Sequence, residues 1–219
     1  MATTRLGGRT SQVALASPAA RRALAERHPA MAILVDAAHP IPRTLPDPRP
    51  LTHLAVRTVV AQLVSTAAAE TITTRLLDTH GSYEAIVAWA MAEPVDAPPS
   101  QGLSRAKRQA LAAWGRMVAA EGDPRPRWAG LDAEGLQREI TKLRGFGRWS
   151  AEMLAIFGFA HPNIWPEGDA GVQRVMRTLV PRMKAPGHRK LVAGYETLAT
   201  LCCWSVLDRG RLEQCRARL

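Results

Sequence analysis

The sequence predicts an all-α fold, and three observations support that prediction. Apolar residues recur at helical spacing through most of the chain, and no segment of useful length alternates between apolar and polar residues with period two. The candidate helices begin at Ser, Asp or Pro and end at Gly or Pro. With 219 residues, the chain can bury one core, or one core divided into two lobes around a cleft.

The first elements are separated by polar and proline-rich segments. Residues 1–17 are small and polar without a sustained period, so we expect a mobile N-terminal arm there. Pro18 opens a helical pattern that breaks near His28. Residues 39–50 (HPIPRTLPDPRP) contain five prolines, which exclude a helix and predict an extended crossing segment.

A longer helical pattern begins at Leu51. Its apolar positions continue to an expected C-cap at Gly81, which predicts either one long helix or two helices that meet near Ser65. Further helices are expected at residues 82–92, 103–120, 132–142, 148–159, 170–180 and 188–207.

In a chain of 219 residues, these helices need not form more than one domain, and we find no internal repeat of 20 to 50 residues. The domain covers residues 18–219. We expect a central lobe at residues 49–165 and a second lobe that combines residues 18–48 with residues 166–219.

The charge predicts a polyanionic partner. Lys and Arg total 29 against 19 acids, which gives a net charge of +10 and a pI near 10.7. Nucleic acid is the leading partner. A membrane surface would use the same charge, but the basic residues are scattered and no polybasic block adjoins an apolar helix, so we expect no membrane partner.

The N-terminus lacks the apolar segment of a signal peptide, and no apolar run approaches the ~18 residues of a membrane span. A cytoplasmic protein is therefore expected, most simply a bacterial one at the nucleoid. We expect it to act as a monomer.

The three cysteines, Cys202, Cys203 and Cys215, form no C-x-x-C pair. They are too few for the four ligands of a zinc site or an iron–sulfur cluster. We interpret them as buried or idle thiols of a reducing compartment, and we expect no iron–sulfur cluster.

Two glycines stand between two expected helices in LRGFGRWSAEML, residues 143–154. The spacing L-x-G-x-G is that of a helix-hairpin-helix with its turn at residues 143–147. Without Cβ atoms, Gly145 and Gly147 let the turn reach positive φ and present backbone N–H groups to one anion, such as a DNA phosphate. An ordinary tight turn with a C-cap glycine is the alternative, and the net charge favours the phosphate.

Asp169 precedes the helical run AGVQRVMRTLV, which predicts an N-cap. Residue 172 is Val, so no capping box is present. A carboxylate at a helix N-terminus is kept ionised by the N–H groups and the helix dipole. The same position therefore suits a group that stabilises positive charge on a sugar, and the two roles are compatible.

Four motifs in this order resemble those of the helix-hairpin-helix DNA glycosylase superfamily: LAVRTVVAQLVSTAAAETI, GLSRAKRQAL, LRGFGRWSAEMLAIFGF and WPEGDAGVQRVM. The resemblance covers roughly residues 50 to 207. The sequence is most similar to the 3-methyladenine DNA glycosylases of AlkA type, through QLVS at 62–65, Trp149 directly after the hairpin and the Pro-x-x-Asp of residues 166–169.

The resemblance implies how the chain would hold double-stranded DNA with damaged bases. Gly145 and Gly147 would bind a phosphate beside the lesion. The resemblance places the residue that fills the gap of a flipped nucleotide at Leu63, for which a core leucine is the alternative. Gln62 beside it is also expected to bind DNA. Backbone carbonyls of the hairpin would hold a monovalent cation in this family, and they belong to Thr141, Leu143 and Phe146.

The base pocket of the family falls on Trp149 and Trp204, whose electron-rich rings suit a cationic alkylated purine. Two further aromatic positions of this branch fall on Met153 and Ala170, which implies a roomier pocket and leaves the substrate range open. Glu196 stands where the branch has an Arg.

The resemblance implies a monofunctional glycosylase of base excision repair, acting on 3-methyladenine-like bases. Asp169 would stabilise the oxocarbenium-like sugar and help to orient water. Bifunctional members carry a lysine where this chain has Trp149, so no Schiff base is expected there. The alternatives are a glycosylase of the same fold for oxidised or deaminated bases, and a non-catalytic DNA-binding protein.

Overall fold

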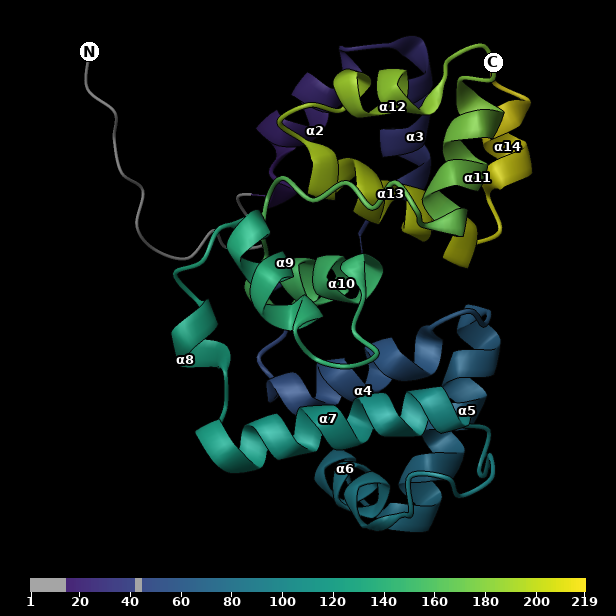
Figure 1. Cartoon of the computed structure of the whole chain (residues 1–219). Helices are drawn as coiled ribbons and strands as arrows, with labels where there is room; N and C mark the ends of the chain where they lie inside the picture. Colours follow the sequence, from purple (N-terminus) through teal and green to yellow (C-terminus); the bar gives the residue numbers. More distant parts are fainter. Residues whose placement is uncertain (1–14, 42–44) are drawn as a thin grey trace, which may run out of the picture. The chain divides into compact units, whose positions relative to one another are not determined.

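The computed structural model describes residues 15–41 and 45–219. Within these residues the chain is helical, with a single isolated bridge between Ser100 and Leu103 and no strand (Figure 1). The predicted all-α fold is confirmed. No helix among the described residues is long and apolar enough to span a membrane.

The chain divides into two compact units. The central unit is Asp47–Phe159, and the terminal unit combines the chain up to Pro46 with Ala160–Leu219. The lobes expected from the sequence were bounded by residues 49 and 165, so the observed division lies slightly earlier at both boundaries.

The central unit contains seven helices among its described residues: α4 Leu51–Ala61, α5 Thr66–His80, α6 Tyr83–Ala92, α7 Arg105–Glu121, α8 Arg125–Trp128, α9 Ala133–Thr141 and α10 Arg148–Phe159. Helix α4 is largely buried and packs against α5, α6, α7 and α10. The fully buried Trp114 of α7 lies 5.6 Å from the Phe146 ring and donates its indole N–H to Thr52 Oγ1 at 3.1 Å. The hairpin is thus anchored in the core of this unit.

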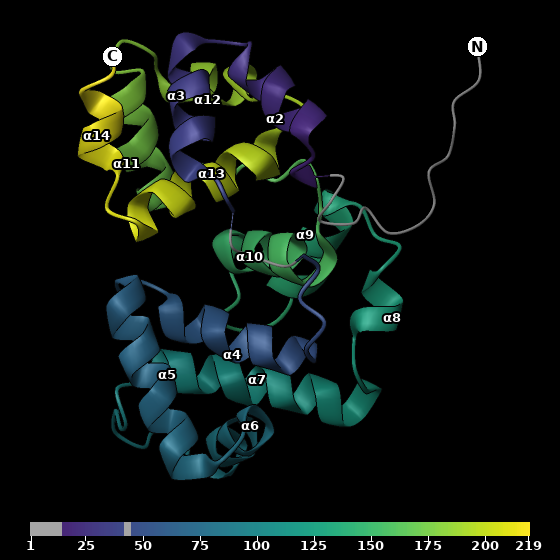
Figure 2. The same ribbon diagram turned by 180° about the vertical axis from the view of Figure 1, so that it is seen from behind.

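The terminal unit is built around α13. Its described helices are α2 Pro18–Ala25, α3 Pro29–Ala38, α11 Ala170–Leu179, α12 Ala185–Leu191, α13 Glu196–Asp208 and α14 Leu212–Arg216. Helix α13 packs against α3 and α11, and α11 also contacts α14, as both views of the chain show (Figure 2). The contact between α11 and α13 brings together residues that are far apart in the sequence.

Several predicted boundaries are confirmed. The pattern from Leu51 to Gly81 forms two helices, and the Ser65 hydroxyl caps the second by accepting from Ala68 N at 3.2 Å. Gly81 ends that helix with φ +82°, a conformation that glycine adopts without a Cβ clash.

The single helix predicted at residues 188–207 is wrong. Two helices, α12 and α13, cover this stretch, and Gly194 between them has φ +82°. Apolar residues on both sides of the break continue the helical spacing, which hid it in the sequence. Helices α8 and α14 were not predicted, because four or five residues are too few to show a period.

The N-terminal arm was predicted to extend to residue 17. Leu15 is buried and Ser17 caps α2 through a 3.1 Å bond from Ala20 N, so this end of the predicted arm belongs to the terminal unit. Residues 1–14, which make up the remainder of the prediction, lie outside the described residues, as do residues 42–44 of the proline-rich segment.

Arg108 offers a test of how the central unit is held together. Its guanidinium is 2% exposed and donates to the carbonyls of Pro98 at 2.8 Å and Ala97 at 2.5 Å. We expect Arg108→Met to lower the free energy of unfolding by about 3 kcal/mol, because these buried carbonyls lose their donor. The exposed neighbour Arg105 is the control, and Arg105→Met should change it by less than about 0.5 kcal/mol. Equal urea midpoints for the two variants would contradict this assignment.

Candidate functional site

The hairpin turn joins α9, which ends at Thr141, to α10, which begins at Arg148. Gly145 has φ +83°, and a Cβ on it would lie 2.5 Å from the Ala110 Cβ of α7. Glycine is therefore needed here for its backbone conformation and for close approach to α7. The turn is closed by a 3.0 Å bond from Phe146 N to the Leu143 carbonyl.

Gly147 differs from Gly145. Its φ is not in the left-handed region, and a Cβ on it would meet no atom of the chain within 4 Å. The expectation of positive φ therefore holds for Gly145 alone. Gly147 stands at the start of α10, and the space beside its Cα is open to a ligand.

The turn after α4 is tied to this hairpin. The Gln62 amide nitrogen donates to the Gly145 carbonyl at 2.9 Å and to Ser150 Oγ at 3.0 Å. Lys107 donates from Nζ to the Val60 carbonyl at 2.8 Å, and burial lowers the pKa of this amine. Gln62 is predicted from the sequence to bind DNA, but its two bonds to the hairpin were not predicted, because they link segments far apart in the chain.

Leu63 follows Gln62 with a backbone that leucine rarely adopts. Its φ is 57°, in the left-handed region, and its side chain is fully exposed at 104% of the reference area. The alternative of a core leucine is wrong. Exposure of a large apolar side chain on an unfavourable backbone stabilises nothing within the chain, and such outliers cluster at functional sites.

Trp149 and Met153 lie four residues apart on α10 and so share one side of that helix. Trp149 is half-buried, whereas Met153 is buried at 5% exposure. Next to them, Arg148 Nε and Glu152 Oε1 form an ion pair at 2.9 Å.

In the terminal unit, Asp169 is the N-cap of α11, as predicted. Its Oδ1 accepts from Val172 N at 2.9 Å and from the Trp204 indole N–H at 3.1 Å. Both donors reach the same oxygen, so the carboxylate is fixed in orientation by one helix terminus and by α13. The bond from Trp204 was not predicted from the sequence, because the helices α11 and α12 and two turns separate the two residues.

The loop before Asp169 is also fixed. Asp169 N donates to the Pro166 carbonyl at 3.0 Å, and Gln173 Nε2 of α11 donates to the Glu167 carbonyl at 2.9 Å. These two bonds fix the segment from Pro166 to Gly168, which leads into Asp169.

No protein-family model matches the chain. In sequence it is 28% identical over 181 residues to the "Probable bifunctional transcriptional activator/DNA repair enzyme AlkA" of Mycobacterium tuberculosis, a match that covers 77% of this chain and 35% of the relative. It is 30% identical over 80 residues to DNA-3-methyladenine glycosylase 1 of Schizosaccharomyces pombe, over 34% of this chain and 35% of the relative. The chain thus spans about a third of the length of these curated relatives.

Two solved structures are similar over most of the chain. The 3-methyladenine DNA glycosylase Mag1 of Schizosaccharomyces pombe, in complex with abasic DNA, matches with a TM-score of 0.73 and 19% identity, over 85% of this chain and 96% of that one. The 3-methyladenine DNA glycosylase of Archaeoglobus fulgidus matches with a TM-score of 0.67 and 18% identity, over 85% of this chain and 68% of that one. The chain has the helix-hairpin-helix glycosylase fold.

Within this glycosylase fold, the predicted pocket residues of the terminal unit lie on α11 and α13. Ala170 is exposed as the first residue of α11, directly after Asp169. Trp204 is half-buried on α13. Glu196, which stands in place of the branch's Arg, is the first residue of α13 and is 8% exposed.

The cysteines of this glycosylase fold are buried free thiols of the terminal unit. Burial raises the pKa of Cys202 to about 12 and raises the pKa of Cys203 and Cys215. A thiol with a raised pKa is a poor nucleophile, so these residues serve the core. Residues 15–41 and 45–219 contain no group of three or more His, Cys, Asp or Glu placed to hold a metal ion.

Substitution of the two hairpin glycines should change the free energy of unfolding by different amounts. We expect Gly145→Ala to lower the free energy of unfolding by about 2 kcal/mol, because the new Cβ clashes with Ala110 and the left-handed φ disfavours alanine. Gly147→Ala should leave it within about 0.5 kcal/mol, since its Cβ points into open space. Chemical denaturation of both variants measures the difference, and equal losses would contradict the different environments of the two glycines.

Proposed function

We propose that this chain is a monofunctional DNA glycosylase of base excision repair, which excises alkylated bases of the 3-methyladenine kind from duplex DNA. The observation that carries the proposal is the carboxylate of Asp169, oriented by Val172 N–H and the Trp204 indole at the N-terminus of α11. In a binding protein, an acid in this position would only repel phosphates. In a glycosylase it faces the charge that the reaction develops.

The reaction requires that the target base leave the helical stack, which costs a few kcal/mol and less at a damaged pair. Leu63 is suited to fill the gap, because its apolar side chain is fully exposed on a turn that Gln62 and Lys107 hold rigid. The hairpin would bind a phosphate through the N–H groups around Gly147, where the chain leaves space for it.

Cleavage of the N-glycosidic bond then builds positive charge on the sugar. Asp169 stabilises this charge electrostatically and helps to orient the attacking water, while the α11 dipole favours its ionised form. A base alkylated on a ring nitrogen leaves as a neutral molecule from a cationic nucleotide, so no strong general acid is needed. Trp149 offers a flat, electron-rich ring to such a cationic purine.

The proposal includes a monovalent cation on the carbonyls of Thr141, Leu143 and Phe146. Helix α9 ends at Thr141, and carbonyls of a last helical turn lack intrahelical donors. The Leu143 carbonyl accepts one bond, from Phe146 N, and keeps a second lone pair. The donor set, of uncharged carbonyl oxygens, suits a weakly bound ion of low charge. No iron–sulfur cluster is part of the proposal.

A single chain carries both the hairpin and the aspartate, which is why we propose that it acts as a monomer. We place it at the bacterial nucleoid, in the cytoplasm, where the duplex DNA lies.

A second candidate substrate class is oxidised or deaminated bases. The observation that favours it is the replacement of two aromatic pocket positions by Met153 and Ala170, which leaves fewer rings to select a cationic purine.

The substrate class is tested by incubating the protein with duplexes that each carry one defined lesion, and by scoring abasic sites. We expect release of 3-methyladenine-type bases and no covalent protein–DNA adduct after borohydride treatment, since Trp149 replaces the lysine nucleophile. Release confined to oxidised or deaminated bases would select the second candidate. Borohydride trapping would contradict the monofunctional mechanism. Absence of base release from every lesion would contradict the glycosylase and favour the non-catalytic DNA-binding protein.

The role of Asp169 is tested by Asp169→Asn. Asn and Asp are similar N-caps, so the melting temperature should change little. Single-turnover base release should fall about 10²- to 10³-fold, because the charge that faces the developing cation is removed. Duplex affinity should be equal or higher, since a repulsion with phosphates is also lost.

The matched control for this variant is Asp132→Asn. Asp132 caps α9 through a 2.7 Å bond from Gly135 N, so it repeats the cap chemistry on a helix without a catalytic role. Its excision rate should equal that of the wild type. Wild-type excision by a folded Asp169→Asn protein would reduce Asp169 to a helix cap and remove the basis of the proposal.

A further inference from the structure

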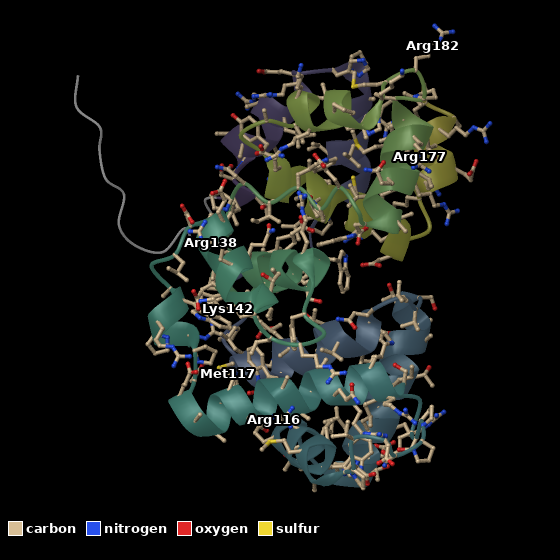
Figure 3. The ribbon with its side chains drawn as sticks, viewed as in Figure 1. Arg116, Met117, Arg138, Lys142, Arg177 and Arg182 are labelled. Atoms are coloured by element: carbon tan, nitrogen blue, oxygen red, sulfur yellow. The ribbon has the colours of Figure 1, made fainter. Side chains whose placement is uncertain are left out.

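The segment between Asp169 and Glu196 carries an excess of basic residues that the proposed function does not explain. No other segment between two successive acids has so many. It contains six basic residues and no acid, although acids make up 19 of the 48 charged residues of the chain (29 + 19). The six are Arg174, Arg177, Arg182, Lys184, Arg189 and Lys190. They lie on α11, on α12 and on the turn between them, and all are exposed (Figure 3 labels Arg177 and Arg182).

Two of these arginines line a hollow beside Asp169. Arg174 and Arg177 are three residues apart on α11 and therefore lie on the same side of it. Together with Gly168 and Ala170, the two neighbours of Asp169, they line a hollow of ≈ 710 Å³. Neither arginine has an ion-pair partner within the described part of the chain, so their charge is available to an external anion.

The basic surface continues onto α12. Arg189 and Lys190 line a second hollow of ≈ 460 Å³, which shares Glu167 and Ala185 with the first. Two acids face it. Glu167 is 3.8 Å from Arg189 and offsets one charge, and Glu196 is 8% exposed and so largely withdrawn from the surface. The lining of the two hollows keeps an excess of positive charge.

We propose that this surface, which we call the α11–α12 basic face and define by the six residues above, binds the phosphodiester backbone of the duplex on which Asp169 acts. The identity of the partner rests on the proposed function. A duplex carries one negative charge per ~1.7 Å of its axis, which matches a row of exposed cations, and guanidinium groups bind phosphate oxygens in a bidentate manner. The face gives the unit that carries Asp169 its own contact with DNA.

This contact differs in chemistry from that of the hairpin. The hairpin would offer backbone N–H groups, whereas the α11–α12 basic face offers charged side chains whose phosphate contacts release condensed counterions. Its contribution should therefore appear in the salt dependence of binding and be the same for damaged and undamaged duplex.

The test is the double variant Arg174→Gln/Arg177→Gln, with duplex affinity measured by fluorescence anisotropy over a range of salt concentrations. Removal of two phosphate contacts should make the negative slope of log K against log salt shallower by about 1.8. Binding should weaken roughly tenfold or more at 0.1 M salt. Both the undamaged duplex and one with an abasic site should show the change.

The control is Arg22→Gln/Arg216→Gln, which removes the same charge from exposed arginines of α2 and α14 in the same unit. Its slope should equal that of the wild type. An unchanged slope in Arg174→Gln/Arg177→Gln would overturn the proposal. Equal losses in both double variants would also overturn it, because they would report net charge alone. A thermal melt of each protein confirms that the variants are folded.

The glycosylase activity and DNA binding by the α11–α12 basic face can be contradicted independently of each other. Duplex binding requires no chemistry, so the face is supported by a specific loss of slope even where the lesion panel shows no base release. The converse result, base release with an unchanged slope, would overturn the face and leave the glycosylase intact. Combination with Gly147→Ala distinguishes the face from the hairpin, since independent contacts give additive losses in the free energy of binding. Non-additive losses would overturn the assignment of two separate contacts.

Discussion

The central unit depends on the contact between Gly145 and α7. Because Gly145 has no Cβ, the hairpin lies against Ala110, where a side chain would be 2.5 Å away. The Gly145 carbonyl is then in reach of Gln62, which fixes the turn after α4. Leu63 is held exposed on that turn, so one close backbone approach positions both the hairpin turn proposed to bind a phosphate and the apolar residue proposed to replace a flipped nucleotide.

In the terminal unit, one oxygen atom performs two tasks. Asp169 Oδ1 caps α11 and accepts from Trp204, so the contact that stabilises the helix also orients the carboxylate. A catalytic group placed in this way needs little strain or isolated burial, because the helix N-terminus already favours negative charge. A helix cap and the proposed catalytic residue can therefore be the same side chain without conflict between stability and activity.

The sequence predicted local features well and long-range contacts poorly. Ser65, Gly81 and Asp169 were identified from turn and capping chemistry, which depends on a few adjacent residues. The break at Gly194 was missed because apolar residues kept the helical spacing across it, and periodicity cannot register a change of helix direction. The bonds from Trp204 to Asp169 and from Gln62 to Gly145 join residues of different helices, for which a single sequence carries no signal. The exposure of Leu63 was likewise undecided until its backbone conformation was known.

The distribution of charge around Asp169 poses a final physical problem. A glycosylase must bring a carboxylate close to a strand of phosphates, and the two repel each other. Arg174 and Arg177 line the hollow that also includes the residues on either side of Asp169, so they would supply positive potential where the carboxylate is proposed to meet the strand. Because they are five and eight residues beyond Asp169 on the helix that it caps, their position relative to the carboxylate is fixed by the same α11 geometry. One short helix would thus orient the catalytic charge through its N-terminus and offset the repulsion of that charge by DNA through its arginines.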